Sequence, residues 1–271
     1  MITTFTKRDP YRCASLMGEA AALRWLEEAE STGGLHATHV LSATDDELVE
    51  ERIVTCRPSR EAAERIGRAL ARTHAAGAAW WGAPPPGWSG SYRIEDSLTP
   101  TVGEENAPSS WGAFYAEHRV MSYVRVLVDR GELPVAAAAP FEHVASRLCA
   151  GDFDAPQPGL VRAGGNEVAR LHGDLWAGNL LWDANPSNAT GGALIDPMAH
   201  GGHAETDLAM LALFGCPYLD VILDAYDEVS TLADGWRERV ELHQLSPVLL
   251  HCVLYGGWYY QEALGIARRY A

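Results

Sequence analysis

The chain has 271 residues, of which 47% are hydrophobic, and it carries a formal net charge of −15 with a pI near 5.0. This composition excludes an intrinsically disordered chain, and the acidic balance argues against binding to nucleic acid or to anionic membranes, which both need a basic face. Five scattered cysteines without a Cys-x-x-Cys pair predict neither a disulfide framework nor a zinc knuckle. Without a signal-peptide core or a membrane-length apolar stretch, we expect a cytoplasmic protein with a sizeable core.

The first predicted elements are a strand and a helix. Residues 2–6 are β-branched and aromatic and predict a strand, with Lys7 at its end. Residues 14–30 carry apolar side chains at helical spacing, with Glu19 near the start. A strand lysine that meets a helix glutamate is the ion pair that orients the phosphate-contacting lysine of kinases. Taken singly, both residues are also compatible with solvated surface charges. A further strand and connection are predicted at residues 47–54.

Helical patterns dominate the rest of the chain. They cover residues 60–76, 111–129, 141–148, 205–214 and 248–260. Arg119 lies among the apolar positions of the second of these helices and is a candidate substrate contact. The alternative is an arginine whose aliphatic stem merely covers apolar surface.

A β-hairpin is predicted between residues 180 and 195. Residues 180–182 read as a buried strand, residues 185–192 are rich in turn-forming types, and residues 193–195 read as the returning strand. Because an antiparallel hairpin brings its open ends together, Asn179 and Asp196 should lie side by side. An amide oxygen and a carboxylate are suitable ligands for Mg²⁺.

Asp174 precedes this hairpin, in a turn allowed by Gly173. A carboxylate next to a metal-bound triphosphate can accept the proton of an attacking hydroxyl, so Asp174 is the candidate base of a phosphotransferase. His172 is interpreted as a buried histidine that bonds to the backbone. Either His-Gly-Asp or Ile-Asp-Pro alone is a common turn or strand end, but together, at kinase spacing around a hairpin, they indicate phosphoryl transfer.

These motifs resemble those of the fructosamine/ketosamine kinase family, small-molecule kinases related to aminoglycoside phosphotransferases. The central match is His172-Gly173-Asp174-Leu175-Trp176-x-Gly178-Asn179, and the tryptophan after His-Gly-Asp-Leu separates this family from its wider relatives. Further similarity is seen in Asp196-Pro197, in Gly202-His203-x-Glu205 and in Phe5-x-Lys7. The likeness covers nearly the whole chain.

The resemblance implies a fold and a reaction. The expected fold is α+β, protein-kinase-like and two-lobed, with a truncated β-rich N-terminal lobe and hinge at residues 1–54 and a mainly helical C-terminal lobe at residues 55–271. The implied reaction is ATP-dependent phosphorylation of a sugar hydroxyl, at O3, of ketosamines such as fructosamines or ribulosamines, in deglycation repair. The amine would belong to a small molecule or to a glycated protein. The sequence does not indicate the oligomeric state.

The resemblance also implies roles for individual residues. Asp174 corresponds to the base, Asn179 and Asp196 to the Mg²⁺ ligands, and Lys7 with Glu19 to the pair at the ATP phosphates. The interlobe hinge, where family members hold adenine through backbone groups, corresponds to Glu50, Glu51 and Arg52. Candidate residues of the substrate pocket are Trp176, His203 and His251, although each is also compatible with a purely structural role.

The chain departs from the family pattern at its start, and its motifs are also compatible with two other functions. In the family, a glycine-bearing strand-turn-strand that covers the phosphates precedes the lysine strand, whereas six residues precede Lys7 here. We therefore expect either a truncated start or weaker ATP binding. One alternative is a non-catalytic nucleotide- or sugar-binding homologue. Another is a metal-dependent phosphohydrolase, in which a His/Asp cluster would hold the metal, formed by His172, Asp174, Asp196, His200, His203 and Asp207.

Overall fold

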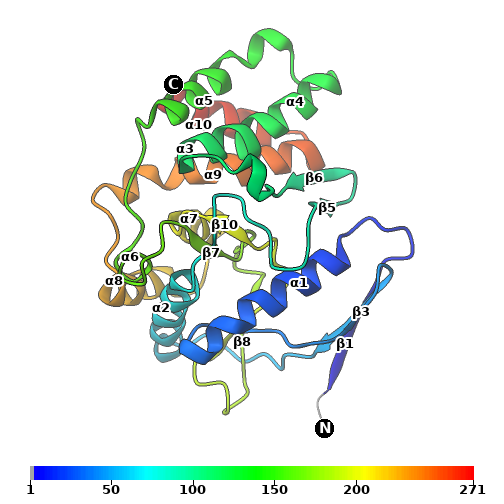
Figure 1. Ribbon diagram of the computed structural model, residues 1–271, viewed down its shortest axis with the longest axis vertical. Coiled ribbons are helices and arrows are strands. Elements are labelled where there is room, and N and C mark those ends of the chain that lie inside the picture. Colours follow the sequence, from blue (N-terminus) through cyan, green and yellow to red (C-terminus); the bar gives the residue numbers. More distant parts are fainter. Residues whose placement is uncertain (1–2) are drawn as a thin grey trace.

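A computed structural model describes residues 3–271 (Figure 1). Its N-terminal part is a three-stranded antiparallel sheet of order β1-β4-β3, with α1 packed against it. The bounds are β1 Thr4–Arg8, α1 Leu16–Glu27, a 3₁₀ turn Glu28–Thr32, β3 Val40–Ala43 and β4 Glu47–Glu51. Lys7 lies inside β1, opposite Leu48 of β4, rather than after its end. Residue 2, where the strand was expected to begin, lies outside the described residues.

Helices form most of the remainder. Their bounds are α2 Arg60–Ala75, α3 Trp111–Tyr115, α4 Ser122–Asp129, α5 Ala139–Ala150, α6 Gly159–Ala163, α7 Glu205–Leu213, α8 Leu219–Val229, α9 Trp236–Tyr255 and α10 Tyr259–Tyr270. The Ser59 hydroxyl caps α2 by accepting from the Ala62 N–H at 3.2 Å, and the Ser110 hydroxyl caps α3 in the same way. One hydrophobic core runs from Leu16 in α1 to Ala267 in α10.

The helix expected at residues 111–129 is present, but it contains a π-helical segment. This segment, Ala116–Met121, joins α3 to α4 and includes Arg119. Wide turns of this kind are rare and occur often at functional sites.

Short strands carry the loops of the candidate site. β7 (Ala169–Leu171) pairs antiparallel with β10 (His200–Gly202), and the predicted hairpin is confirmed as β8 (Leu180–Trp182) and β9 (Gly192–Leu194). β2 (His36–Ala37), from the N-terminal part, pairs parallel with β9. The β8–β9 hairpin is therefore joined directly to the N-terminal part of the molecule.

Two regions differ from the expectations. The helix expected at residues 248–260 begins much earlier, at Trp236, and α9 ends at Tyr255, where Gly256 and Gly257 adopt positive φ before α10 starts. A hairpin that was not predicted, β5 (Ser91–Ile94) and β6 (Ser97–Pro100), lies beside the start of α1, where the Arg93 N–H donates to the Ser15 hydroxyl at 2.8 Å. No helix among residues 3–271 is long and apolar enough to cross a membrane.

Candidate active site

Five of the residues predicted for catalysis, for the metal and for the ATP phosphates line one cavity of about 420 Å³. They are Lys7, Glu19, Asp174, Asn179 and Asp196. Lys7 and Glu19 come from β1 and α1, whereas the other three flank the β8–β9 hairpin. Trp176 borders the same cavity. The structure thus brings together residues that are up to 189 positions apart in the chain.

The hairpin places Asn179 beside Asp196. Leu180 pairs with Leu194, and the Ile195 N–H donates to the Asn179 carbonyl at 3.1 Å, which closes the ladder at its open end. Asp196 follows with a φ of 54°, a left-handed conformation that aspartate tolerates better than most residues. Asn179 and Asp196 therefore lie at neighbouring positions at the open end of the hairpin, and both line the cavity.

Asp174 lies in a turn that only glycine permits at the preceding position. Gly173 has a φ of 83°, and a Cβ there would lie 2.2 Å from the Met198 carbonyl oxygen. The Asn179 amide nitrogen donates to the Asp174 carboxylate at 3.1 Å and to its carbonyl at 2.8 Å. Burial, reinforced by the charges of Asp196 and Asp207 and opposed by the Asn179 hydrogen bond, raises the pKa of Asp174 to about 7.

A buried carboxylate that was not singled out for this role holds the turn in place. Asp207 of α7 accepts from the backbone N–H groups of His172 at 2.7 Å and Gly173 at 3.0 Å, and it pairs with His74 at 3.2 Å. His172 accepts from the Asp174 N–H through Nδ1, so its Nε2–H donates to the Ile195 carbonyl at 2.9 Å. An aspartate in the first turn of the mostly apolar helix at residues 205–214 was the sequence signal for this support.

Three carboxylates surround the ammonium of Lys7. It forms ion pairs with Glu19 and Asp196, and Glu50 lies 3.8 Å away. Burial alone would lower the pKa of Lys7, but these carboxylates outweigh it and raise the pKa. Burial raises the pKa of Glu50, one of whose carboxyl oxygens has no hydrogen-bond partner among the described residues. The carboxylates around Lys7 therefore favour its charged form.

The residues expected at the hinge lie where the chain leaves the N-terminal sheet. Glu50 and Glu51 are the last residues of β4, and the Arg52 N–H donates to the Thr3 carbonyl at 2.8 Å. Glu51 pairs with His36, which also bonds to Glu30 at 3.0 Å. This turn is consequently held by both backbone and side-chain contacts.

Of the predicted substrate residues, Arg119 is buried and His251 is partly buried. The Arg119 guanidinium donates to the carbonyls of Pro100 at 2.8 Å and His118 at 2.9 Å and lies over the ring of Phe114. Arg119 and Asp174 both border a second, small cavity of about 40 Å³. His251, on α9, donates through Nδ1 to the Pro247 carbonyl at 2.6 Å and remains partly exposed.

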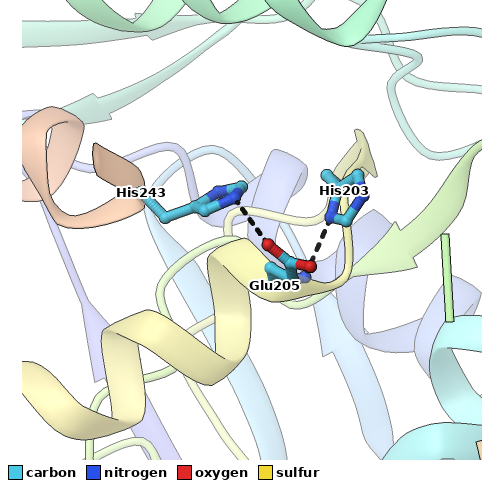
Figure 2. A group of neighbouring side chains, drawn as sticks. All are labelled: His203, Glu205 and His243. Carbon is cyan, nitrogen blue, oxygen red and sulfur yellow. Dashed lines mark hydrogen bonds and ion pairs between the residues drawn. The ribbon is translucent and has the colours of Figure 1, made fainter. Parts of the chain in front are cut away.

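His203 belongs to a different cluster, with Glu205 and His243 (Figure 2). Glu205 lies between the two rings: its backbone N–H donates to His203 at 3.2 Å, and its carboxylate is 3.3 Å from His243. Arg239 binds the same carboxylate through two hydrogen bonds, of 2.8 Å and 2.6 Å. Burial opposes ionisation, but the bonds from His243 and Arg239 lower the pKa of Glu205 to about 2.

This cluster is saturated by protein contacts. His203 Nε2–H donates to the Ala155 carbonyl at 3.2 Å, and His243 Nδ1 pairs with the Thr206 hydroxyl at 2.9 Å. A metal ion would have to displace Arg239 and break several of these bonds. His172 and His200 likewise bond to backbone carbonyls. The arrangement disfavours the His/Asp metal cluster that a phosphohydrolase would need.

Comparison with known proteins identifies the family. The family model described as fructosamine kinase matches residues 4–270. The chain belongs to the fructosamine kinase family. A "Probable ketoamine kinase" of Synechocystis sp. is 32% identical over 229 residues, which cover 83% of this chain and 68% of the relative. The "Probable ketoamine kinase YniA" of Escherichia coli strain K12 is 30% identical over 192 residues, 71% of this chain and 58% of the relative.

The chain matches several curated relatives over little more than half of their own length. For the Vibrio parahaemolyticus protein, the match covers 53% of the relative. Among solved structures, a chain from Thermobifida fusca assigned as a fructosamine-3-kinase is 39% identical, with a TM-score of 0.81, and the match covers 98% of this chain and 85% of that one. A choline kinase from Streptococcus pneumoniae shares the fold, with a TM-score of 0.59 at 13% identity over 98% of this chain and 85% of that one. The expected kinase-like α+β fold is confirmed, and the family consists of ATP-dependent phosphotransferases.

Proposed function

We propose that this member of the fructosamine kinase family transfers the γ-phosphoryl group of ATP to a sugar hydroxyl of a ketosamine. The family resemblance implies that this hydroxyl is at O3. The observation that carries the proposal is the single cavity in which Asp174, Asn179, Asp196 and the Lys7–Glu19 pair meet. Residues 1–54 would supply the nucleotide-binding groups, and residues 55–271 the base, the metal ligands and the acceptor pocket.

Asp174 is assigned as the base that receives the proton of the sugar hydroxyl. A base works best when its pKa lies near the operating pH, and a pKa of about 7 meets this condition. The hydrogen bond from Asn179 orients the carboxylate, and the bonds from Asp207 to the preceding backbone fix the turn. The carboxylate would therefore be held in place before the acceptor binds.

Asn179 and Asp196 are assigned as ligands of Mg²⁺. Carboxylate and amide oxygens are the donors that this hard cation prefers. The Asn179 amide nitrogen is engaged by Asp174, and its oxygen accepts no hydrogen bond among the described residues, so the oxygen is free to bind a cation. A bound Mg²⁺ would neutralise phosphate charge as the phosphoryl group is transferred.

Lys7 is assigned to the ATP phosphates, with Glu19 as the residue that orients it. Acidic side chains surround this one lysine, and they disfavour a triphosphate that carries no divalent cation. Binding of the Mg²⁺ complex would free Lys7 from Asp196 and direct it to the phosphates. The backbone around Glu50, Glu51 and Arg52 is assigned to adenine.

Trp176 is assigned to the acceptor side because it borders the cavity two residues after Asp174 and is 40% exposed. His251 is assigned to the same side, because the Phe214 ring contacts both the Trp176 ring and the His251 ring. Arg119 would support this side indirectly, by tying Pro100 of β6 to the π-helical segment. His203 would act as part of the support for α7.

A phosphorylation assay tests the proposal. The purified chain would be incubated with ATP, Mg²⁺ and a synthetic fructosamine, and the product examined by ³¹P and ¹³C nuclear magnetic resonance. We expect a phosphate ester on the sugar, and Asp174→Asn is the matched control for contaminating kinases. ATP consumption without a sugar ester, or an ester that persists with Asp174→Asn, would overturn the proposal.

A further inference from the structure

A continuous series of aromatic rings leads from the candidate active site to the surface. Ring centroids are 6.2 Å apart between Trp176 and Phe214, and 5.2 Å between Phe214 and His251. His251 lies 5.5 Å from Tyr255 and 5.0 Å from Tyr259, which stacks on Trp258 at 4.5 Å. All these separations are typical of interacting aromatic pairs. We call this set the aromatic wall; it comprises Trp176, Phe214, His251, Tyr255, Trp258 and Tyr259.

The aromatic wall is unusually open to solvent. Trp176 is 40% exposed, Phe214 44%, Tyr255 62% and Trp258 64%. Isolated exposed apolar residues are common, but contiguous aromatic surface of this kind marks a binding site in a soluble domain. The position of the aromatic wall links it to the candidate active site, because Trp176 also lines the cavity that contains Asp174. The aromatic wall and the phosphoryl-transfer site thus form one surface.

The backbone between α9 and α10 is built to present the outer end of this surface. Gly256 and Gly257 have φ values of 59° and 68°, a conformation that other residues rarely adopt. This turn ends α9 at Tyr255 and starts α10 at Tyr259, which brings the three outer rings together. Tyr255, Trp258 and Tyr259 therefore meet at the junction of the two helices.

We propose that the aromatic wall binds the amine-derived part of the ketosamine, and that this part is flat and aromatic. This inference rests on the proposed ketosamine kinase activity. With the sugar held over Asp174, the substituent on its nitrogen would extend past Trp176 along the aromatic wall. The nitrogen of a ketosamine is a secondary ammonium near neutral pH, and aromatic faces attract such cations. An aromatic substituent would add stacking contacts with the outer rings.

Two matched substrates test the inference. Fructosyl-phenylalanine and fructosyl-glycine share the sugar, the nitrogen and the carboxylate and differ only by a benzyl group. We expect kcat/KM to be about tenfold higher for the phenylalanine derivative, mainly through a lower KM. Tyr255→Ala and Trp258→Ala should each reduce the ratio of the two kcat/KM values towards one. Both side chains are mostly exposed, and a melting curve verifies that each variant is folded.

Trp236→Ala is the matched control. Trp236 begins α9, 19 residues before Tyr255, which places it about 28 Å away along the helix. It should leave the substrate ratio unchanged. Equal kcat/KM for the two substrates in the unmodified protein, or an unchanged ratio in both wall variants, would overturn the inference and leave the kinase proposal intact. Failure to phosphorylate either fructosamine would overturn the kinase proposal and this inference with it.

Discussion

The carbonyl of Leu194 accepts two hydrogen bonds from Thr38, one from the backbone N–H at 3.0 Å and one from the hydroxyl at 2.8 Å. Thr38 follows β2 in the N-terminal part, whereas Leu194 ends β9, two residues before Asp196. Thr38 is fully buried. A residue of the N-terminal part thus fixes the strand that precedes a proposed metal ligand.

Thr38→Val should weaken Mg²⁺ binding although Thr38 contacts neither proposed metal ligand. Valine keeps the shape but loses the hydroxyl bond, which contributes about 1 kcal/mol to stability. We expect the Mg²⁺ concentration for half-maximal activity to rise several-fold, as measured by titration at saturating ATP. Thr38→Ser, which retains the hydroxyl, is the control and should restore it. A destabilised Thr38→Val protein with an unchanged Mg²⁺ requirement would restrict Thr38 to a structural role.

Asp174→Asn should abolish turnover and spare nucleotide binding. Because the base contacts the acceptor hydroxyl and not ATP, kcat should fall by roughly a hundredfold or more. ATP affinity, measured by calorimetry in the presence of Mg²⁺, should remain within a few-fold. Near-normal turnover in the variant would remove Asp174 from the role of base.

Asp196→Ala and Asn179→Ala should both raise the Mg²⁺ requirement. Asp196 should be the more damaging position because its side chain supplies a charge as well as an oxygen. Magnesium titrations of the two variants, compared with Asp183→Ala in the turn of the same hairpin, provide the measurement. If both ligand variants gave the wild-type curve, the assignment of the hairpin as a metal clamp would be refuted.

His36 should make stability depend on pH. Burial lowers its pKa, but the hydrogen bonds and charges of Glu30 and Glu51 outweigh burial and raise the pKa to about 9. A group whose pKa rises on folding stabilises the fold fully below its unfolded pKa, near 6.5, and loses this contribution as the pH passes the folded value. His36→Gln should therefore cost about 1 to 2 kcal/mol at pH 6.

The same comparison at high pH supplies the contrast. Above pH 9 the two proteins should have nearly equal free energies of unfolding, measured by chemical denaturation. A difference that is constant from pH 6 to pH 10 would show that His36 acts through packing alone. His39→Gln is a suitable control, since His39 pairs with Glu27 at a more exposed position.

The sequence predicted the parts of the site that depend on local chain geometry. The β8–β9 hairpin followed from its turn-rich residues 185–192, and its ends necessarily brought Asn179 to Asp196. The strand of Lys7 and the helix of Glu19 were likewise predicted from short-range patterns, which a single sequence displays directly. Their ion pair was expected because such a pair orients the phosphate-contacting lysine of kinases.

The features that escaped prediction depend on long-range contacts or atypical turns. β2 has only two residues, too few for any periodicity, and it is stabilised by β9 more than 150 positions later. The β5–β6 turn contains Glu95 at a φ of 53°, where glycine or asparagine is the usual signal. The first half of α9 is too polar to show its buried face in the sequence. Burial of Arg119 and His203 likewise became visible only with their tertiary partners.

The attachment of β2 to β9 has a mechanical consequence when it is combined with a second junction. The segment after β4 is also bonded to the hairpin: the Cys56 N–H donates to the Trp182 carbonyl at 2.8 Å, and the Ala184 N–H donates to the Val54 carbonyl at 2.8 Å. The chain segments before β3 and after β4 are therefore bonded to opposite edges of the strand pair that is flanked by Asn179 and Asp196. Because these attachments lie on opposite edges of the hairpin, the N-terminal part cannot pivot about either one alone. We therefore expect the separation between Lys7 of β1 and Asn179 of the hairpin to change little when substrates bind.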